Sequence, residues 1–140
     1  MQAVRPERTG WRDQQLSERH RRWGFDCPAV DIDFLLLEYD KGKPIALIEY
    51  KHELKQTFSM GHPTFHAVMT LADRANIPFF AVRYKHDLSK FKVCTGNIIA
   101  ENYLPEGEAI FTEQKWVKFL YKLRGYDCPQ SILDGLKVAV

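Results

Sequence analysis

The chain has 140 residues, of which 45% are hydrophobic and 27% charged; this composition is that of a folded globular protein and excludes a disordered chain. The length fits one domain over residues 1–140, and the formal net charge of +2 neither requires nor excludes a nucleic-acid partner. The three cysteines are not in CxxC spacing, so neither a disulfide framework nor a zinc site is indicated. No apolar run resembles a signal peptide or a membrane span, so we expect an intracellular protein without a membrane partner.

The N-terminal region is predicted to begin with a loose arm over residues 1–10 and to continue as a helix over about residues 11–23. Six arginines and three acidic residues lie within residues 1–24, and clustered arginine is a weak indication of phosphate binding. Arg19 and Arg22 are therefore candidate nucleic-acid contacts. The alternative is that these side chains only form a solvated helix face.

A β-hairpin is predicted next. Residues 31–39 are rich in strand-forming residues, and residues 45–51 form the returning strand. Between them, residues 40–43 have the composition of a turn, in which Gly42 is free to take a positive φ.

The rest of the chain is predicted to combine helices with strands. Pro63 suits the first turn of a helix that runs to about Asn76, and Thr112 is suited to cap a later helix that ends at Gly125. The expected strands are residues 79–84 and 91–95, with residues 98–104 as a further candidate. This order of elements indicates an α/β fold with a central mixed β-sheet flanked by helices. Because a helix forms the crossover, strand 79–84 is expected to run parallel to the strand before it.

Charged residues gather at one end of the predicted hairpin. Residues two apart in a strand share a face, so Glu49 and Lys51 lie on the same face of the returning strand. If the turn is centred near Lys41, Asp33 lies opposite Glu49. Asp31 then lies opposite Lys51. Burying such carboxylates is costly unless a cation accompanies them.

This combination of carboxylates and an amine is suited to metal-assisted chemistry. A hard divalent cation such as Mg²⁺ takes oxygen ligands and keeps positions open for water. An adjacent lysine does not ligate the metal, but it can hold a water molecule and offset charge on a transferring phosphoryl group. The residue types therefore fit phosphodiester hydrolysis assisted by Mg²⁺ or Mn²⁺.

The motif formed by Asp33, a gap of 15 residues and Glu49-Tyr50-Lys51 resembles the signature of the PD-(D/E)xK nuclease superfamily. The order of predicted elements over residues 12–85 also resembles the core of that superfamily. The resemblance implies a restriction-endonuclease-like core. It also implies that Asp33 and Glu49 are metal ligands, that the backbone carbonyl of Tyr50 is a third, and that Lys51 positions the attacking water or stabilises the transition state. Asp33, Glu49 and Lys51 are thus the expected catalytic residues.

Two further acidic residues are candidate metal ligands. Pro28 stands three residues before Asp31 and not beside it, which leaves the choice between Asp31 and Asp33 open. Many members of the superfamily place a glutamate on the first helix, and Glu18 is the corresponding residue. Glu18 points away from the helix face that Leu16 packs, so it reaches the site only if the helix packs through another face.

Basic residues and histidines near the expected site are candidate nucleic-acid contacts. His62 and His66 are four residues apart, which is the spacing of a metal pair on a helix, but no third ligand is evident. Contact with phosphate is the other interpretation of these histidines. Arg83 and Lys85 end a strand near the same edge and are candidates for contacts with backbone phosphates.

We therefore expect a Mg²⁺-dependent nuclease that cleaves DNA. The chain leaves little room for a separate sequence-reading domain, so recognition of DNA structure is expected, and a homodimer fits the cutting of both strands. One alternative is a catalytically inactive nucleic-acid-binding or assembly protein with the same fold. In the other alternative, these residues have only structural roles: Asp31 and Asp33 are exposed acids at a strand end, and Glu49 and Lys51 form a surface salt bridge.

Overall fold

The computed structural model describes residues 15–16, 18–19, 22–23, 32–52 and 61–136. The chain divides into two compact units, Met1–Asp31 and Ile32–Val140. In the first unit, residues 15, 16, 18, 19 and 22 are helical, in agreement with the predicted helix, and the backbone N–H of Trp23 donates to the carbonyl of Arg19 at 3.0 Å. None of the helices among the described residues is long and apolar enough to cross a membrane.

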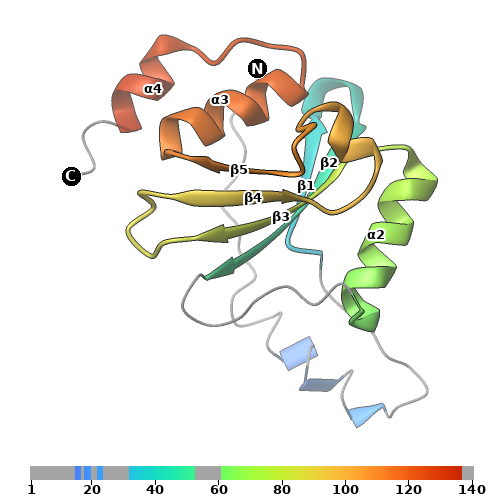
Figure 1. Ribbon diagram of the computed structural model, residues 1–140. Coiled ribbons are helices and arrows are strands. Elements are labelled where there is room, and N and C mark those ends of the chain that lie inside the picture. Colours follow the sequence, from blue (N-terminus) through green and yellow to red (C-terminus); the bar gives the residue numbers. More distant parts are fainter. Residues whose placement is uncertain (1–14, 17, 20–21, 24–31, 53–60, 137–140) are drawn as a thin grey trace. The chain divides into compact units, whose positions relative to one another are not determined.

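The second unit contains a five-stranded sheet with the strand order β1-β2-β3-β4-β5 (Figure 1). The strands are β1 (Phe34–Glu38), β2 (Lys43–His52), β3 (Phe79–Tyr84), β4 (Phe91–Thr95) and β5 (Glu108–Phe111). Strands β2 and β3 are parallel, whereas the other neighbouring pairs are antiparallel. The predicted mixed sheet and the parallel crossover are both confirmed.

Three helices belong to the described part of this unit, and side chains cap the first two. They are α2 (Pro63–Ala75), α3 (Glu113–Leu123) and α4 (Gln130–Leu136), with the short 3₁₀ turns η1 (Tyr39–Lys41) and η2 (Ile99–Asn102). At the start of α2, Nδ1 of His62 accepts a hydrogen bond from the N–H of Thr64 at 3.2 Å, and Pro63 occupies the first turn. At the start of α3, the hydroxyl oxygen of Thr112 accepts a hydrogen bond from the N–H of Lys115 at 3.3 Å. Both predicted helix starts are confirmed.

The hairpin of β1 and β2 has the expected turn and register. The chain reverses through η1, and Gly42 follows in the left-handed region with a φ of 60°. Phe34 pairs with Ile48, which is the register of a turn centred near Lys41. A shift after Leu36 changes the pairing only nearer the turn. The register at the end that carries the acidic residues is therefore the predicted one.

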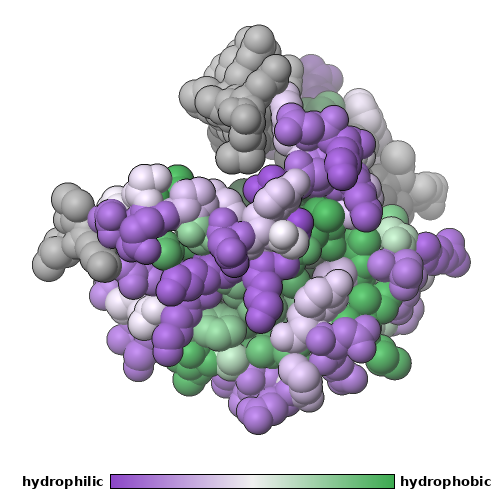
Figure 2. Space-filling view, turned by 90° about the horizontal axis from the view of Figure 1, so that it is seen from above, coloured by the Kyte–Doolittle hydropathy of each residue, from purple (hydrophilic) through white to green (hydrophobic). Residues whose placement is uncertain are grey.

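Apolar clusters cover both faces of the sheet. Helix α2 packs on one face and α3 on the other (Figure 1). The buried residues on the α2 face are Leu47, Phe65, Val68, Ala72, Ile77, Phe79 and Ala81. Those on the α3 face are Ile48, Phe80, Val82, Phe91, Val93, Ala100 and Trp116. Figure 2, seen from the side of α3 and α4, shows hydrophilic residues across this face with apolar residues between them.

A buried asparagine organises the segment around η2. Oδ1 of Asn97 accepts hydrogen bonds from the N–H groups of Phe79 and Ala100, both at 3.0 Å. Its Nδ2 donates to the carbonyl of Ile77 and to the carboxylate of Asp73, also at 3.0 Å. These bonds fold the chain into a 3₁₀ turn after Asn97, so the prediction of a strand over residues 98–104 is wrong.

The first strand is shorter than expected. It begins at Phe34, because Asp33 lies in a bend and uses its side chain in place of backbone pairing. Asp31 lies outside the described residues. Strand β5 and helix α4 were not expected; β5 adds to the edge of β4, and α4 is tied to α3 by a hydrogen bond from Gln114 to the carbonyl of Leu133 at 3.3 Å.

Candidate functional site

The carboxylate of Asp33 is held against the neighbouring strand β2. Its Oδ2 accepts a hydrogen bond from the backbone N–H of Tyr50 at 3.0 Å. Continuing the register of Phe34 and Ile48 by one residue sets Asp33 opposite Glu49. The two acids that the sequence analysis singled out are thus neighbours across the hairpin.

Glu49 and Lys51 share the face of β2 that α2 covers further along the strand. Leu47 belongs to the cluster on the α2 face, whereas Ile48 and Tyr50 pack on the α3 face. Because side chains alternate between the faces of a strand, Glu49 and Lys51 follow Leu47 on the α2 face. Both are half-buried, so each side chain is partly open to solvent.

The charge environment of Glu49 links these three side chains. Burial raises the pKa of the Glu49 carboxyl above its ordinary value, and the neighbouring Asp33 carboxylate raises it further. The ammonium group of Lys51 acts in the opposite direction and lowers that pKa. Asp33 and Lys51 are therefore both close enough to Glu49 to influence its ionisation.

The side chain of Tyr50 anchors β2 on the opposite face of the sheet. Its hydroxyl oxygen accepts a hydrogen bond from Nε1 of Trp116 at 3.0 Å, and its ring packs edge-on against Phe34, Tyr84 and Trp116. Burial raises the pKa of the Tyr50 hydroxyl, while the bond with Trp116 lowers it. Because Tyr50 is fixed on the α3 face, the side chains of its neighbours Glu49 and Lys51 lie on the α2 face.

The backbone of Tyr50 offers a further oxygen beside the acids. A residue in a strand directs its N–H and its C=O to the same side. The N–H of Tyr50 points to Asp33, and the N–H of Leu47 points the other way, to the carbonyl of Pro78 before β3. The carbonyl of Tyr50 therefore faces the side on which β1 has ended, next to Asp33.

Two predicted basic residues lie next to this group on β3. Arg83 is the Cα partner of Lys51 in the parallel pairing, and Lys85 follows the end of β3. Neighbouring strands present paired residues on the same face, so Lys51 and Arg83 set two positive charges side by side.

The remaining predicted residues lie at the start of helix α2 or in the first unit, and their roles stay predictions. His62 caps α2 through Nδ1 and precedes the helix, and His66 is exposed on its first turn. Glu18, Arg19 and Arg22 belong to the first unit and lie outside the part of the chain that carries Asp33 and Glu49.

The donor set fits Mg²⁺ better than zinc. Within residues 15–16, 18–19, 22–23, 32–52 and 61–136, no three His, Cys, Asp or Glu side chains are grouped to hold a metal, so a structural zinc site is not formed there. Mg²⁺ commonly binds through one or two carboxylates and keeps several waters. Asp33 and Glu49, with the carbonyl of Tyr50, could form such a set, and a cation would offset the burial and the repulsion by Asp33 that raise the pKa of Glu49.

Sequence reasoning missed two polar contacts that hold the hairpin in place, one near the site and one near the turn. Trp116 was expected only as part of the core, and its indole N–H gave no indication of a bond to Tyr50, 66 residues away. Glu38 forms a largely buried ion pair with Arg124 at 3.3 Å, which ties the turn end of the hairpin to the end of α3. A charged residue inside the apolar run of β1 was the available signal for Glu38, since buried charges are usually paired.

Comparison of the chain with known protein families, with curated proteins and with solved structures found no match.

Proposed function

We propose that this protein is an intracellular, Mg²⁺-dependent deoxyribonuclease with a restriction-endonuclease-like core. The observation that carries the proposal is the group at the end of the hairpin. The Asp33 carboxylate is held by the Tyr50 N–H beside Glu49, and Lys51 shares the face of Glu49. Two acids and an amine on two paired strands are suited to metal-assisted hydrolysis of a phosphodiester.

In this proposal each residue has a separate task. Asp33, Glu49 and the carbonyl of Tyr50 would hold Mg²⁺ or Mn²⁺, which supplies Lewis-acid stabilisation of the phosphoryl oxygens when bound. Lys51 orients the attacking water and offsets the negative charge that develops on the phosphoryl group. The reaction forms one P–O bond from water and breaks the bridging P–O bond, so the products are a phosphomonoester and an alcohol.

The basic residues would bind the substrate. Arg83 and Lys85 continue the positive charge of Lys51 along β3, which suits phosphates on both sides of the scissile bond. The described sheet offers no separate module for reading base sequence, so we propose an endonuclease directed by DNA structure. A homodimer would supply the second site that cutting both strands of a duplex needs.

Cleavage assays with site variants test this function. Labelled linear duplex, nicked duplex, flap, four-way junction and single strand are incubated with Mg²⁺ and with Mn²⁺. We expect cleavage of at least one of these DNAs. The cleavage rate should fall at least about 100-fold in Glu49→Gln, which removes a charged metal ligand, and in Lys51→Ala, which removes the charge that stabilises the phosphoryl group in the transition state. An inactive binding protein would bind these DNAs and cut none.

Matched controls come from the turn end of the same hairpin. Asp40 and Lys43 are exposed and far along the hairpin from the acidic end, so Asp40→Asn and Lys43→Ala should cleave like the wild type. Equal cleavage by Glu49→Gln and the wild type would remove the proposed function.

A further inference from the structure

The loop between β3 and β4 holds an exposed leucine in a strained backbone conformation. Leu88 has a φ of 62°, in the left-handed region, and 43% of its surface is exposed. Its N–H donates to the carbonyl of Lys85 at 2.9 Å, which makes it the residue that closes a tight turn. Glycine or asparagine usually takes this position, because a larger side chain is strained at a positive φ. An outlier that keeps this strain points to a function for the side chain.

The loop around Leu88 is held in place from both sides. The N–H of Lys85 donates to the carbonyl of Lys90 at 3.1 Å, and the carboxylate of Asp87 accepts a bond from the N–H of Ser89 at 3.0 Å. The hydrogen bonds from the hydroxyl and from the N–H of Ser89 lower the pKa of Asp87, so the ionised carboxylate stabilises the turn. The leucine is therefore presented outward by an ordered tip.

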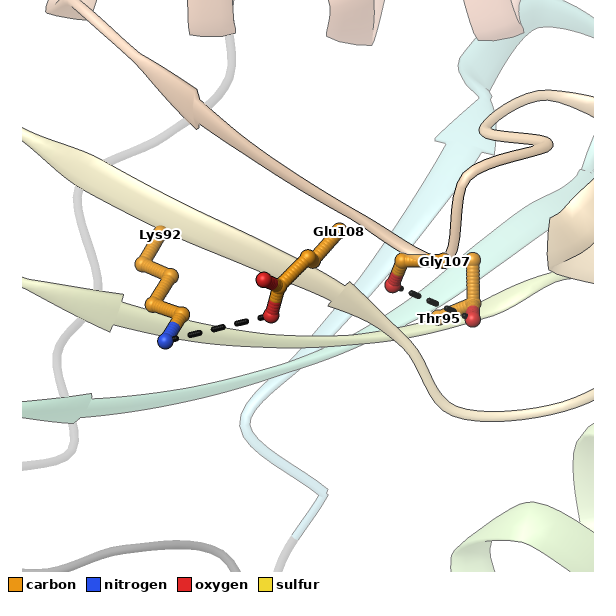
Figure 3. A network of polar contacts seen from close by, with 4 residues as sticks. All are labelled: Lys92, Thr95, Gly107 and Glu108. Carbon is orange, nitrogen blue, oxygen red and sulfur yellow. Dashed lines mark hydrogen bonds and ion pairs between the residues drawn. The ribbon is translucent and has the colours of Figure 1, made fainter.

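Positive charges flank the leucine. Lys92 on β4 forms an exposed ion pair with Glu108 on β5 at 3.8 Å, and in Figure 3 the two side chains point toward each other. Neither Lys85 nor Lys90 forms an ion pair within the described part of the chain. Asp87 is the acid of residues 85–90, so two lysines against one carboxylate leave the tip with a net charge of +1. An apolar tip with net positive charge suits a polyanion that also offers apolar surface, as a nucleic acid with exposed bases does.

The tip extends from the end of the sheet that carries the candidate site (Figure 1). Arg83 pairs with Lys51, and Leu88 follows Arg83 by five residues. At about 3.3 Å per residue, the tip lies at most about 17 Å from Arg83, the strand partner of Lys51. This length corresponds to about five base pairs of duplex at 3.4 Å each.

We propose that Leu88 is a wedge that enters DNA at a step where the bases are already unstacked, while Lys85 and Lys90 bind the phosphates on either side. The proposal rests on the nuclease function above and names its substrate: duplex DNA with a discontinuity such as a nick. Apolar side chains are known to separate base steps in DNA. Separation costs less where stacking is already interrupted, so the wedge favours nicked over intact duplex.

Binding in metal-free buffer tests the wedge without any cleavage. Fluorescence anisotropy is measured with nicked and intact duplexes of the same sequence. We expect the wild type to bind the nicked duplex about tenfold more tightly, and Leu88→Gly to reduce this preference to about one- to twofold. The glycine variant should melt at a higher temperature than the wild type, because it relieves the strained φ.

Control variants separate the wedge from general affinity. Leu71→Ala removes an exposed leucine from α2 and should keep the wild-type preference. The double change Lys85→Ala and Lys90→Ala should weaken binding to both duplexes alike and flatten its salt dependence.

Each result has a defined meaning. An unchanged preference in Leu88→Gly, or no preference in the wild type, overturns the wedge. Cleavage is scored separately: wild-type cuts in the presence of Mg²⁺ should lie within about five nucleotides of the nick. If nicked DNA is bound through Leu88 but never cut, the nuclease function fails and the DNA contact stands. If DNA is cut through Glu49 while Leu88→Gly keeps its preference, the wedge alone fails.

Discussion

Exchanging Asp33 for asparagine tests the metal site without removing the contact that orders it. Asparagine keeps a side-chain oxygen that can accept the hydrogen bond from the Tyr50 N–H. In the wild type the Tyr50 nitrogen lies 3.0 Å from Oδ2 of Asp33. The change loses the charge-assisted part of one exposed hydrogen bond, about 1 kcal/mol. It also removes the repulsion between Asp33 and Glu49, which acts in the stabilising direction. The free energy of unfolding should therefore change by less than about 1 kcal/mol in metal-free buffer.

The response to metal should differ much more between the two proteins. A cation at about 100 times its dissociation constant stabilises a folded protein that binds it by about 2.7 kcal/mol. For a chain of this size, this stabilisation raises the melting temperature by about 5–10 °C. We expect that rise for the wild type with Mg²⁺ or Mn²⁺, and little or none for Asp33→Asn.

Thermal denaturation followed by circular dichroism, with and without Mg²⁺, measures both effects. Asp40→Asn is the matched control, because Asp40 is an exposed aspartate on the turn of the same hairpin, and it should respond to metal like the wild type. An equal rise in melting temperature for Asp33→Asn and the wild type would refute a cation site that uses this carboxylate.

Three further predictions concern Glu49 and two residues that contact Phe79, namely Asn97 and Gly96. Burial and the Asp33 carboxylate raise the pKa of Glu49 in the folded protein, so the ionised form of Glu49 opposes folding. The stability that the bound proton contributes is complete below the ordinary pKa of 4.5. This stability is lost as the pH rises through the pKa of the folded protein. In metal-free urea titrations, Glu49→Gln should then be more stable than the wild type at pH 7, with a difference that shrinks toward pH 4. Asn97→Ala leaves three buried backbone groups without their partner and should lower the free energy of unfolding by about 3–5 kcal/mol; a loss below 1 kcal/mol in denaturant titrations would contradict this role. Gly96→Ala would set a Cβ 2.6 Å from the ring of Phe79 and should cost about 1–3 kcal/mol by overpacking, whereas an unchanged melting temperature would show that the ring can move aside.

The hairpin and its acidic end could be predicted because their signals are local. Alternation of side chains in residues 45–51 and a turn with Gly42 define one register, and that register sets Asp33 opposite Glu49. The bend at Asp33 could not be predicted, because it depends on a side chain that takes over a backbone bond from Tyr50.

Long-range polar contacts were beyond prediction for a related reason. Asn97 has the composition of a loop residue, and its partners Asp73, Ile77 and Phe79 lie 18 to 24 residues away. Only the packed fold brings these groups together and buries them. The strand expected after Asn97 was wrong because hydrophobic content indicates burial but not whether a buried side chain ends the strand.

The amino-acid sequence alone determined the α/β class, the parallel crossover through α2 and the shared face of Glu49 and Lys51, since periodicity, turn residues and handed connections act over short stretches of chain. The tertiary structure decided how far Glu49 is buried, that Tyr50 is anchored by Trp116, and where Leu88 is presented. These properties depend on the dielectric surroundings and on partners that only packing brings within contact, and no local pattern carries that information.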